Sequence, residues 1–320
     1  MPIDPATRAR GRLALYEAAR RHLYDGNVTS IDFGFPSRGG RRVRGKPAIR
    51  FHVARKLSGF ALERAVGARE TAPLPSSVGE FETDVVEGRY RPHWWMWRPT
   101  TSSPRLRRLD PLRGGISVSR EGQYGPGTLA GVVLDRATGD PMLLSNWHVF
   151  VADWSTRPGV AVYQPGRRDG GTFQDLVARY TRDAMGVNLD AAVAMTADSR
   201  RLSNEQLELG PVRGLTEPAL GMRVVKSGRQ TGITYGEVTG VDGAVKLRYG
   251  FLDRVIRRVV TIEPIAGAGE VSDGGDSGSL WLDASSRACV ALHFAGSNLP
   301  ERALGMEINP VLDALGVDLA

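Results

Sequence analysis

The chain has 320 residues, of which 41% are hydrophobic and 24% are charged. A chain of this length and composition forms about two globular domains with at least one large core, which excludes a disordered tail protein. The hydrophobic runs are short and broken by charges, so we expect no membrane-spanning helix and no secretory signal peptide. A single cysteine, Cys289, excludes an internal disulfide and favours a reducing, cytoplasmic location.

The net charge of +7 is distributed unevenly along the chain. Residues 1–113 contain 22 basic and 11 acidic residues, a net charge of +11, whereas residues 114–320 contain 20 basic and 24 acidic residues, a net charge of −4. Two parts of opposite charge suggest two units with different roles. The basic part leaves open a nucleic-acid or acidic partner, and the composition does not decide whether the chain forms homo-oligomers.

Residues 1–90 predict a small α/β accessory domain. Apolar residues recur near a 3.6-residue period over residues 6–24, which predicts a helix. Two apolar runs, 28–35 and 48–53, flank a turn at 37–40 and predict a hairpin. A short helix near 59–68 and a strand near 83–86 complete the unit. The basic residues within the hairpin either bind phosphates or form a solvated loop; they are Arg41, Arg42, Arg44 and Lys46.

Residues 91–113 have the composition of a linker. Four prolines exclude a long helix or a central strand: Pro92, Pro99, Pro104 and Pro111. The aromatic cluster at residues 93–97 (HWWMW) is compatible with stacking on single-stranded nucleic acid or with packing between domains. We therefore expect this segment to join two units, residues 1–90 and 114–320.

Residues 114–320 consist of short β-type runs separated by Gly, Asp and Asn turns. The predicted strands lie at 128–134, 141–145, 160–163, 189–195, 222–225, 237–241, 255–262, 279–282 and 288–294. Such spacing, with few helical segments, is typical of an antiparallel sandwich or barrel, so we expect a mainly β protein.

Three segments of this β-rich part contain residues that support nucleophilic catalysis. Strand 141–145 leads into His148, Asp190 precedes an apolar run, and Ser277 lies in a glycine-rich turn. A serine hydroxyl needs a base to remove its proton, and a histidine imidazole has a suitable pKa. A carboxylate orients that imidazole, so the three residue types together predict one mechanism.

Each of these assignments has a structural alternative. The alternative for Ser277 is that it belongs to a simple glycine turn without a catalytic role. The alternative for His148 is that it is a packed histidine at the end of a strand. Asp175 and Asp183 compete with Asp190 for the role of the acid, because aspartate is also common in turns.

The turn around Ser277 gives two further indications. Glycine permits a sharp turn, so the backbone N–H groups of Gly275 and Ser277 are candidates to bind the oxyanion of a tetrahedral intermediate. The turn does not have the G-x-S-x-G pattern of α/β-hydrolases, because Ser279 occupies the last position. The order Ser, acid, His of that class is also absent, which excludes it.

The order His148, Asp190, Ser277, with the motifs NWHV and GDSGS, resembles the trypsin/chymotrypsin-like serine proteases, in particular their disulfide-free intracellular bacterial branch. Segments GGIS (114–117), GTL (127–129), KSGRQTG (226–232) and ALHFAG (291–296) add to the resemblance. The segment LSNWHV is also similar to plant narrow-leaf-type trypsin-like proteins.

The resemblance covers residues 113–320 and implies a double six-stranded β-barrel. It implies that the site lies between the barrels, with His148 and Asp190 on the first and Ser277 on the second. Residues 27–90 resemble an accessory domain that precedes the protease in some bacterial members.

The same resemblance implies a substrate pocket with Val271, His293, Phe294 and Ala295 as its candidate residues. Val271 stands where enzymes that cleave after Arg or Lys place a carboxylate. We therefore expect a preference for Glu, Gln or a small apolar residue before the scissile bond, with His293 meeting that side chain. The alternative is that His293 is a core residue.

The sequence thus predicts a serine endopeptidase that acts on protein or peptide substrates without a cofactor or a bound metal. The alternative is a regulatory protein that binds nucleic acid or a partner and whose protease fold is latent. A third hypothesis is a zymogen, in which cleavage after Arg113 frees an amino group that pairs with Asp276.

Overall fold

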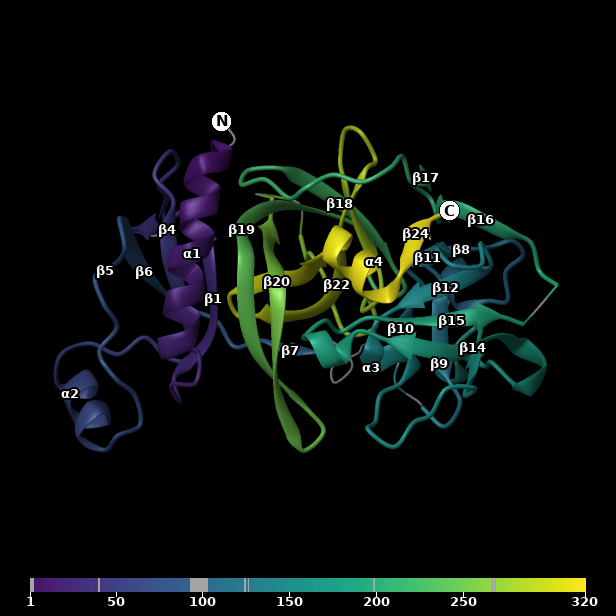
Figure 1. The fold of residues 1–320 in the computed structure, drawn as a ribbon, viewed down its shortest axis with the longest axis horizontal. Coiled ribbons are helices and arrows are strands. Elements are labelled where there is room, and N and C mark those ends of the chain that lie inside the picture. Colours follow the sequence, from purple (N-terminus) through teal and green to yellow (C-terminus); the bar gives the residue numbers. More distant parts are fainter. Residues whose placement is uncertain are drawn as a thin grey trace.

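The computed structural model describes residues 3–39, 41–92, 103–123, 125, 127–197, 199–265, 267 and 269–320. The molecule is mainly β, as the sequence predicts, with a helix and a small group of strands at one end and larger β units beside them (Figure 1). Among the described residues, no helix is both long enough and apolar enough to cross a membrane.

The N-terminal elements follow the predicted order. They are α1 (Pro5–His22), β1 (Val28–Gly34), β2 (Ser37–Arg38), β3 (Arg41–Arg42), β4 (Ala48–Val53), α2 (Gly59–Gly67), β5 (Ser77–Val78) and β6 (Phe81–Glu87). The Asp4 carboxylate caps α1 by accepting a hydrogen bond from the N–H of Thr7 at 2.9 Å. β1 and β4 form the expected antiparallel hairpin, and β6 adds to β4 in parallel.

The sheet of these N-terminal elements continues into the C-terminal part of the chain. β1 pairs antiparallel with β19 (Gly232–Tyr249), with Ser30 opposite Val245 and Gly34 opposite Gly240. α1 packs on β1, β4 and β19 (Figure 1). The division of the chain into residues 1–90, 91–113 and 114–320 stays a prediction. Strand pairing and side-chain packing connect the first of these parts with the last.

One buried apolar cluster combines α1, β1 and β4 with β19 and later strands. Its members include Leu15, Ala18, Phe33, Phe51, Val241, Ile262 and Trp281. Burying an aliphatic or aromatic side chain contributes about 1.5–3 kcal/mol. The N-terminal elements are therefore held to the β units by a shared core as well as by strand pairing.

A buried ionic cluster lies within the shared sheet. Arg50 on β4 donates two hydrogen bonds of 2.6 Å to Asp32 on β1, and Thr261 on β20 (Leu252–Pro264) donates another of 2.6 Å. His52 Nε2 lies 3.2 Å from the same carboxylate. Burial alone would raise the pKa of Asp32, but Arg50 and His52 more than offset it and hold this pKa well below its ordinary value. The carboxylate is therefore ionised inside the protein.

Two arginines of the basic hairpin contact glutamates of the neighbouring strands. Arg42 lies 2.7 Å from Glu237 on β19 and 2.5 Å from Glu263 on β20. Arg44 lies 2.9 Å from Glu237. These ion pairs hold the hairpin against the β unit. They also compensate the positive charges of Arg42 and Arg44, which were candidates for binding phosphate.

The predicted linker contains short elements. They are β7 (Arg91–Pro92), the 3-10 turn η1 (Pro104–Leu106) and β8 (Leu112–Gly114), while the aromatic cluster at 93–97 lies outside the described residues. Arg105 is buried and donates hydrogen bonds to the carbonyl of Gly115, to Ser227 and to Glu208. This segment is therefore fastened to the β units on both sides of the cluster.

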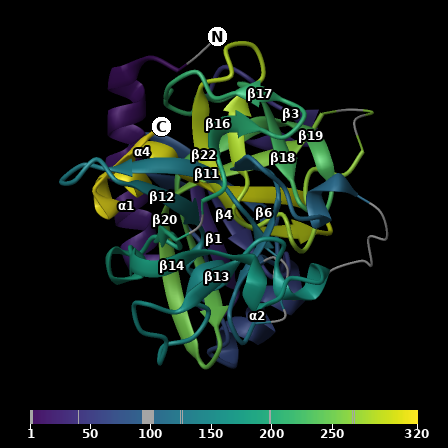
Figure 2. The same cartoon turned by 90° about the vertical axis from the view of Figure 1, so that its right-hand side faces the viewer.

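The first β unit is an eight-stranded sheet with the strand order β10-β9-β13-β14-β15-β12-β11-β24, and it faces the viewer in Figure 2. Its strands are β9 (Ser117–Arg120), β10 (Gly127–Thr128), β11 (Gly131–Asp135), β12 (Pro141–Ser145), β13 (Ala161–Tyr163), β14 (Leu176–Asp183), β15 (Ala192–Thr196) and β24 (Val317–Leu319). A three-stranded sheet adds β16 (Leu202–Gln206) and β17 (Gly210–Pro211) to β8. Short 3-10 turns at η2 (Arg167–Asp169), η3 (Phe173–Asp175) and η4 (Met185–Val187) connect the strands.

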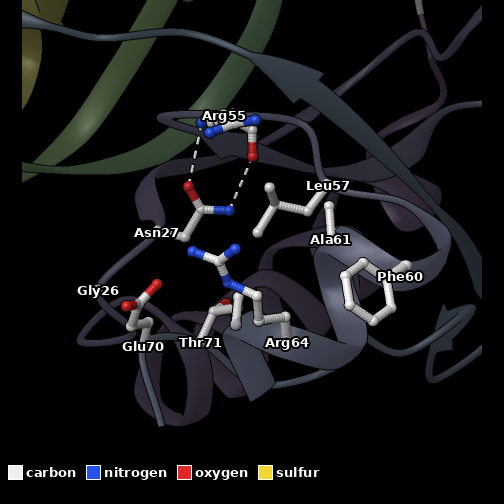
Figure 3. A pocket seen from close by; sticks show the side chains of 10 residues that line it. Gly26, Asn27, Arg55, Leu57, Phe60, Ala61, Arg64, Glu70 and Thr71 are labelled. Carbon is white, nitrogen blue, oxygen red and sulfur yellow. Dashed lines mark hydrogen bonds between the residues drawn. The ribbon is translucent and has the colours of Figure 1, made fainter. Parts of the chain in front are cut away.

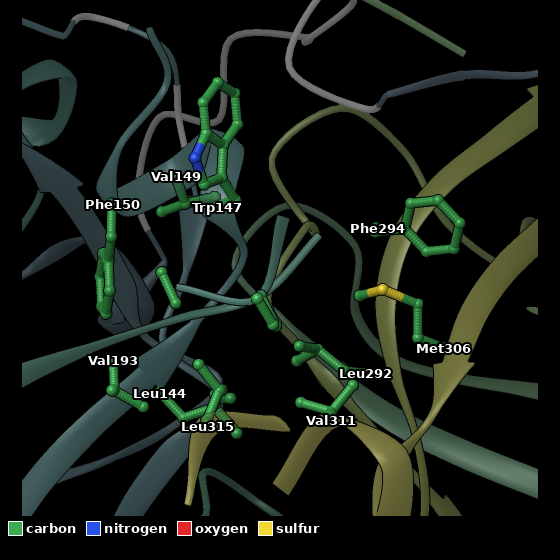
Figure 4. Close-up of a cluster of buried hydrophobic side chains, with 14 of the residues drawn as sticks. Leu144, Trp147, Val149, Phe150, Val193, Leu292, Phe294, Met306, Val311 and Leu315 are labelled. Atoms are coloured by element: carbon green, nitrogen blue, oxygen red, sulfur yellow. The ribbon is translucent and has the colours of Figure 1, made fainter. Parts of the chain in front are cut away.

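The second β unit has the order β18-β21-β22-β23-β20-β19, and β18 also pairs with β19, which joins the ends of this run into a ring. Its remaining strands are β18 (Arg223–Gly228), β21 (Leu280–Asp283), β22 (Cys289–Asn298) and β23 (Glu301–Glu307). α4 (Ile308–Leu315) follows and leads to β24, which pairs with β11 of the first unit. Both units contribute to one buried cluster, seen in Figure 4, that includes Leu144, Trp147, Phe150, Leu292, Phe294 and Met306.

Some elements were not predicted from the sequence. β14 contains Arg179, Arg182 and Asp183, so its apolar pattern is weak, and it forms because β13 and β15 pair with its two edges. β19 and β20 extend well beyond the predicted 237–241 and 255–262, since each pairs with neighbours on both edges.

We expect acid to weaken the fold through the buried ionic cluster. Burial lowers the pKa of His52, and Asp32 offsets this only in part, so the folded chain disfavours the protonated imidazole. His52 then takes up a proton on unfolding once the pH falls below its unfolded pKa of about 6.5. This lowers the free energy of unfolding by up to about 1.4 kcal/mol per pH unit for one proton. The Asp32 contribution persists to lower pH, because the pKa of that carboxyl is depressed.

Urea unfolding followed from about pH 8 to about pH 5 measures this effect. The His52→Gln variant should show a flatter dependence of the unfolding free energy on pH than the wild type. Equal slopes in the two proteins would contradict the role assigned to His52.

Candidate active site

The structure brings His148 and Asp190 into direct contact. His148 lies on the short helix α3 (Trp147–Phe150) after β12, and Asp190 lies just before β15, which pairs with β12. His148 Nδ1 lies 2.6 Å from Asp190 Oδ2, and the backbone N–H of His148 donates to Oδ1 at 3.1 Å. The carboxylate thus holds both the ring and the backbone of His148 in place.

The Asp190 carboxylate has a further partner that sequence reasoning missed. The hydroxyl of Tyr249, at the end of β19, donates a hydrogen bond to Asp190 Oδ2 at 2.7 Å. Burial, followed by the charge of Asp190, raises the pKa of Tyr249 well above its ordinary value, so the phenol remains a donor. No local motif marks Tyr249, because the residue lies 59 positions away from Asp190.

The two competing aspartates lie in other local structures. Asp175 forms a capping box with Thr172 at the start of η3. Asp183 accepts hydrogen bonds from the hydroxyl of Tyr180 at 2.5 Å and from the N–H of Met185 at 2.9 Å. The structure therefore pairs His148 with Asp190, the acid that we favoured from the sequence.

Ser277 lies in the turn before β21. Hydrogen bonds from the first β unit fix the backbone of this turn. The N–H of Thr128 donates to the Ser277 carbonyl at 2.8 Å, and the Thr128 hydroxyl donates to the Gly275 carbonyl at 2.7 Å. Gly278 has a φ of +98°, and a Cβ at this position would collide with the Thr128 carbonyl. Only glycine fits there.

The carboxylate next to Ser277 is buried and fully paired. Lys226 Nζ donates to Asp276 Oδ2 at 2.8 Å, Thr231 donates to it at 2.6 Å, and the N–H groups of Gln230 and Thr231 donate to Oδ1 at 2.8 and 3.0 Å. Burial alone would raise the pKa of Asp276, but Lys226 and Thr231 hold it well below its ordinary value. In the intact chain Lys226 supplies the cation that the zymogen hypothesis required from a new amino group.

The side chain of Ser277 is directed toward β22 in this structure. Its hydroxyl donates to the carbonyl of Phe294 at 3.4 Å. His148 Nε2 has no hydrogen-bond partner among the described residues. Ser277 is 0% exposed and His148 is 1% exposed, so both groups are shielded from solvent.

The two oxyanion candidates are available as donors. Gly275 has a φ of +110°, as a sharp turn requires. Neither its N–H nor that of Ser277 donates a hydrogen bond to another described residue.

The pocket candidates surround the same turn, and all four are buried. The N–H of Gly278 donates to the His293 carbonyl at 3.0 Å, and the His293 N–H donates to Ser279 at 2.9 Å. The His293 ring lies against Trp281, whose Nε1 is 3.4 Å from Nδ1. The N–H of Val271 donates to the Glu301 carboxylate, a residue that was not among our candidates.

A separate pocket of about 570 Å³ lies among the N-terminal elements (Figure 3). It is lined by residues that include Asn27, Arg55, Phe60 and Arg64, and the Asn27 side chain exchanges two hydrogen bonds with the backbone of Arg55. None of the candidate residues lines this pocket. Within the described part of the chain, no group of three or more His, Cys, Asp or Glu side chains is arranged to hold a metal ion.

The fold is similar to that of solved serine proteases. A glutamic-acid-specific serine protease, described as using a histidine triad in substrate binding, matches with a TM-score of 0.50 and 19% identity over 65% of this chain and 100% of its own. A chymotrypsin from Cellulomonas bogoriensis and a protease from Nocardiopsis match with TM-scores of 0.47 and 0.48 and identities of 19% and 17%, each over 65% of this chain and 97% of its own.

No model of a protein family matches the sequence, and no curated protein matches it. At such low identity the first of these structural matches establishes only that the chain shares the fold of that serine protease. Activity has to be argued from the site itself.

Replacing Lys226 tests the support beneath Ser277. The substitution Lys226→Met leaves the Asp276 carboxylate buried without its cation, which should cost about 3–5 kcal/mol of unfolding free energy. The double substitution Lys226→Met/Asp276→Asn removes both charges and should recover much of that loss. Urea unfolding measures both variants, and equal stability of the single variant and the wild type would contradict the assigned role.

Proposed function

We propose that this protein is a serine endopeptidase that hydrolyses peptide bonds through Ser277, His148 and Asp190. The observation that carries the proposal is the 2.6 Å contact between His148 Nδ1 and Asp190, with Nε2 left without a partner among the described residues. Because Asp190 accepts a hydrogen bond from Nδ1–H, the lone pair of the imidazole is at Nε2. A general base needs this lone pair to accept the proton of the serine hydroxyl. The fold shared with serine proteases supports this reading.

The reaction follows from these positions. Ser277 Oγ attacks the carbonyl carbon while its proton passes to His148 Nε2, and the carbonyl electrons become the oxyanion held by the N–H groups of Gly275 and Ser277. When the tetrahedral intermediate collapses, the C–N bond breaks and His148 gives the proton to the leaving amine. A water molecule then attacks the acyl-enzyme by the same proton transfers and releases the acid.

Catalysis requires the Ser277 hydroxyl to turn from the Phe294 carbonyl toward His148. Catalytic hydrogen bonds are often long or absent before the substrate binds, so this conformation is compatible with the mechanism. The 3.4 Å bond to the carbonyl is weak enough to be exchanged.

The pocket side chains favour Gln or a small apolar residue before the scissile bond over Glu. In this proposal His293 meets a polar substrate side chain. The Glu301 carboxylate accepts a hydrogen bond from the N–H of Val271, one of the pocket candidates. Its negative charge beside this position opposes an acidic substrate.

A second candidate function is a regulatory binding protein with a latent protease fold. The complete burial of Ser277 favours it, because a latent enzyme keeps its nucleophile covered. The basic N-terminal elements are the candidate surface for nucleic acid or an acidic partner, although Arg42 and Arg44 are engaged by glutamates. A fluorophosphonate probe separates the two functions, because it labels only an activated serine.

The Ser277→Ala variant should lose fluorophosphonate labelling and nearly all peptidase activity while it keeps its urea-unfolding midpoint. Asp190→Asn should reduce kcat by about 10⁴-fold, because the wrong imidazole tautomer is favoured. Rates on a protein substrate and labelling kinetics measure both variants. Full activity in either one would refute the assignment.

Cleavage of a peptide library tests the pocket. We expect cleavage mainly after Gln or small apolar residues, and Glu301→Gln should raise cleavage after Glu relative to Gln. Strong cleavage after Arg in the wild type would overturn this specificity.

A further inference from the structure

A segment of the chain's own N-terminal part pairs with the strand next to Ser277. β7 forms an antiparallel pair with β22, in which Pro92 lies opposite Ala295 and Arg91 lies opposite Gly296. Ala295 directly follows Phe294, whose carbonyl accepts the Ser277 hydroxyl. The pairing therefore begins one residue beyond Phe294, the β22 residue that contacts the candidate nucleophile.

Among the described residues, no strand other than β7 pairs with the part of the β22 edge at Ala295 and Gly296 that lies opposite β23. On one edge, β23 pairs with β22 along the whole stretch from Ala291 to Asn298. On the other edge, β21 pairs with β22 only as far as Leu292. The N–H and the carbonyl of His293 still bond to Ser279 and Gly278 on this side. Beyond His293, β7 is the strand that pairs with this edge among the described residues. An exposed strand edge of this kind is where an extended peptide binds by strand addition.

β7 is anchored by the residues that precede it. The Tyr90 hydroxyl lies 2.6 Å from His52 Nδ1, and Tyr90 is buried. The N–H of Gly88 donates to the Val53 carbonyl at 2.9 Å, and Arg302 on β23 donates to the Glu87 carbonyl at 2.5 Å. The N-terminal elements, themselves paired with β19, thus deliver Arg91 and Pro92 to the edge of β22.

We propose that Arg91–Pro92 is an intramolecular inhibitor of the candidate active site, which occupies the edge of β22 until an extended peptide substrate displaces it. This inference rests on the proposed endopeptidase function. It accounts for a nucleophile and a base that are both buried beside an intact contact between His148 and Asp190.

The pairing is built to be displaced. β7 has only two residues, and Pro92 has no N–H to donate to β22. A substrate that pairs over more residues forms more hydrogen bonds to the same edge. Substrates with a long extended segment are therefore expected to react better than short ones.

The test compares the full-length chain with an Arg91→Gly/Pro92→Gly variant. Glycine favours the unpaired state of the segment and disfavours a strand. The matched control is Arg157→Gly/Pro158→Gly, which makes the same two changes in an exposed loop. The readouts are the rate of Ser277 labelling by a fluorophosphonate, casein hydrolysis, and hydrogen exchange at Ala295 and Gly296.

We expect the Arg91/Pro92 variant to be labelled about tenfold faster and to show a correspondingly lower KM for casein with little change in kcat, because a larger fraction is competent to bind. Exchange at Ala295 and Gly296 should become faster. The control should behave like the wild type. A synthetic peptide of residues 87–92 (EGRYRP) added to the variant should slow labelling again.

Two results would count against the inference in different ways. Equal labelling rates and equal exchange in the wild type and the Arg91/Pro92 variant would overturn it and leave the proposed protease function standing. No labelling and no casein hydrolysis in any of the proteins would overturn the proposed function, and the inhibitor role would fall with it.

Discussion

The antiparallel pairing of β1 with β19 is the interaction on which the rest of the structure depends. β19 pairs with β1, β18 and β20 along different parts of its length, and its last residue, Tyr249, donates to Asp190. The same pairing places β4 and β6 beside the second β unit, and the chain leaves β6 close to the edge of β22. One strand thus links the N-terminal elements, the candidate acid and the β7 segment that pairs with β22.

Several arginines of the basic N-terminal part form ion pairs within the protein. The basic excess of residues 1–113 leaves open an external acidic partner, and within the protein Arg42, Arg44 and Arg50 contact Glu237, Glu263 and Asp32. These contacts join the basic part to the acidic part, or join strands within their shared sheet. Burying such pairs is costly unless each charge is compensated, so they define how the parts fit rather than adding much stability.

The candidate site combines groups held by several hydrogen bonds with groups held by few. Asp276 with Lys226, and Asp190 with His148 and Tyr249, are buried and held by several short hydrogen bonds. The Ser277 hydroxyl and β7 are each held by few contacts. Under the two proposals above, preorganised donors beside a weakly held segment allow the site to be exposed without being rebuilt.

The sequence alone determined the mainly β fold and the order of the elements that it predicts, because each is marked by a local pattern of strands and turns. It also singled out His148, Asp190 and Ser277 as candidate residues by their motifs. Only the tertiary structure decided that Tyr249 and Lys226 support these residues, that Glu301 reaches Val271, and that Arg91–Pro92 lies on β22. Local propensity contains no information about such contacts, since their partners are far apart in the chain and meet only through strand pairing and burial. The length of β19 and the formation of β14 also depend on pairing with neighbouring strands. The sequence does not show which strands are neighbours.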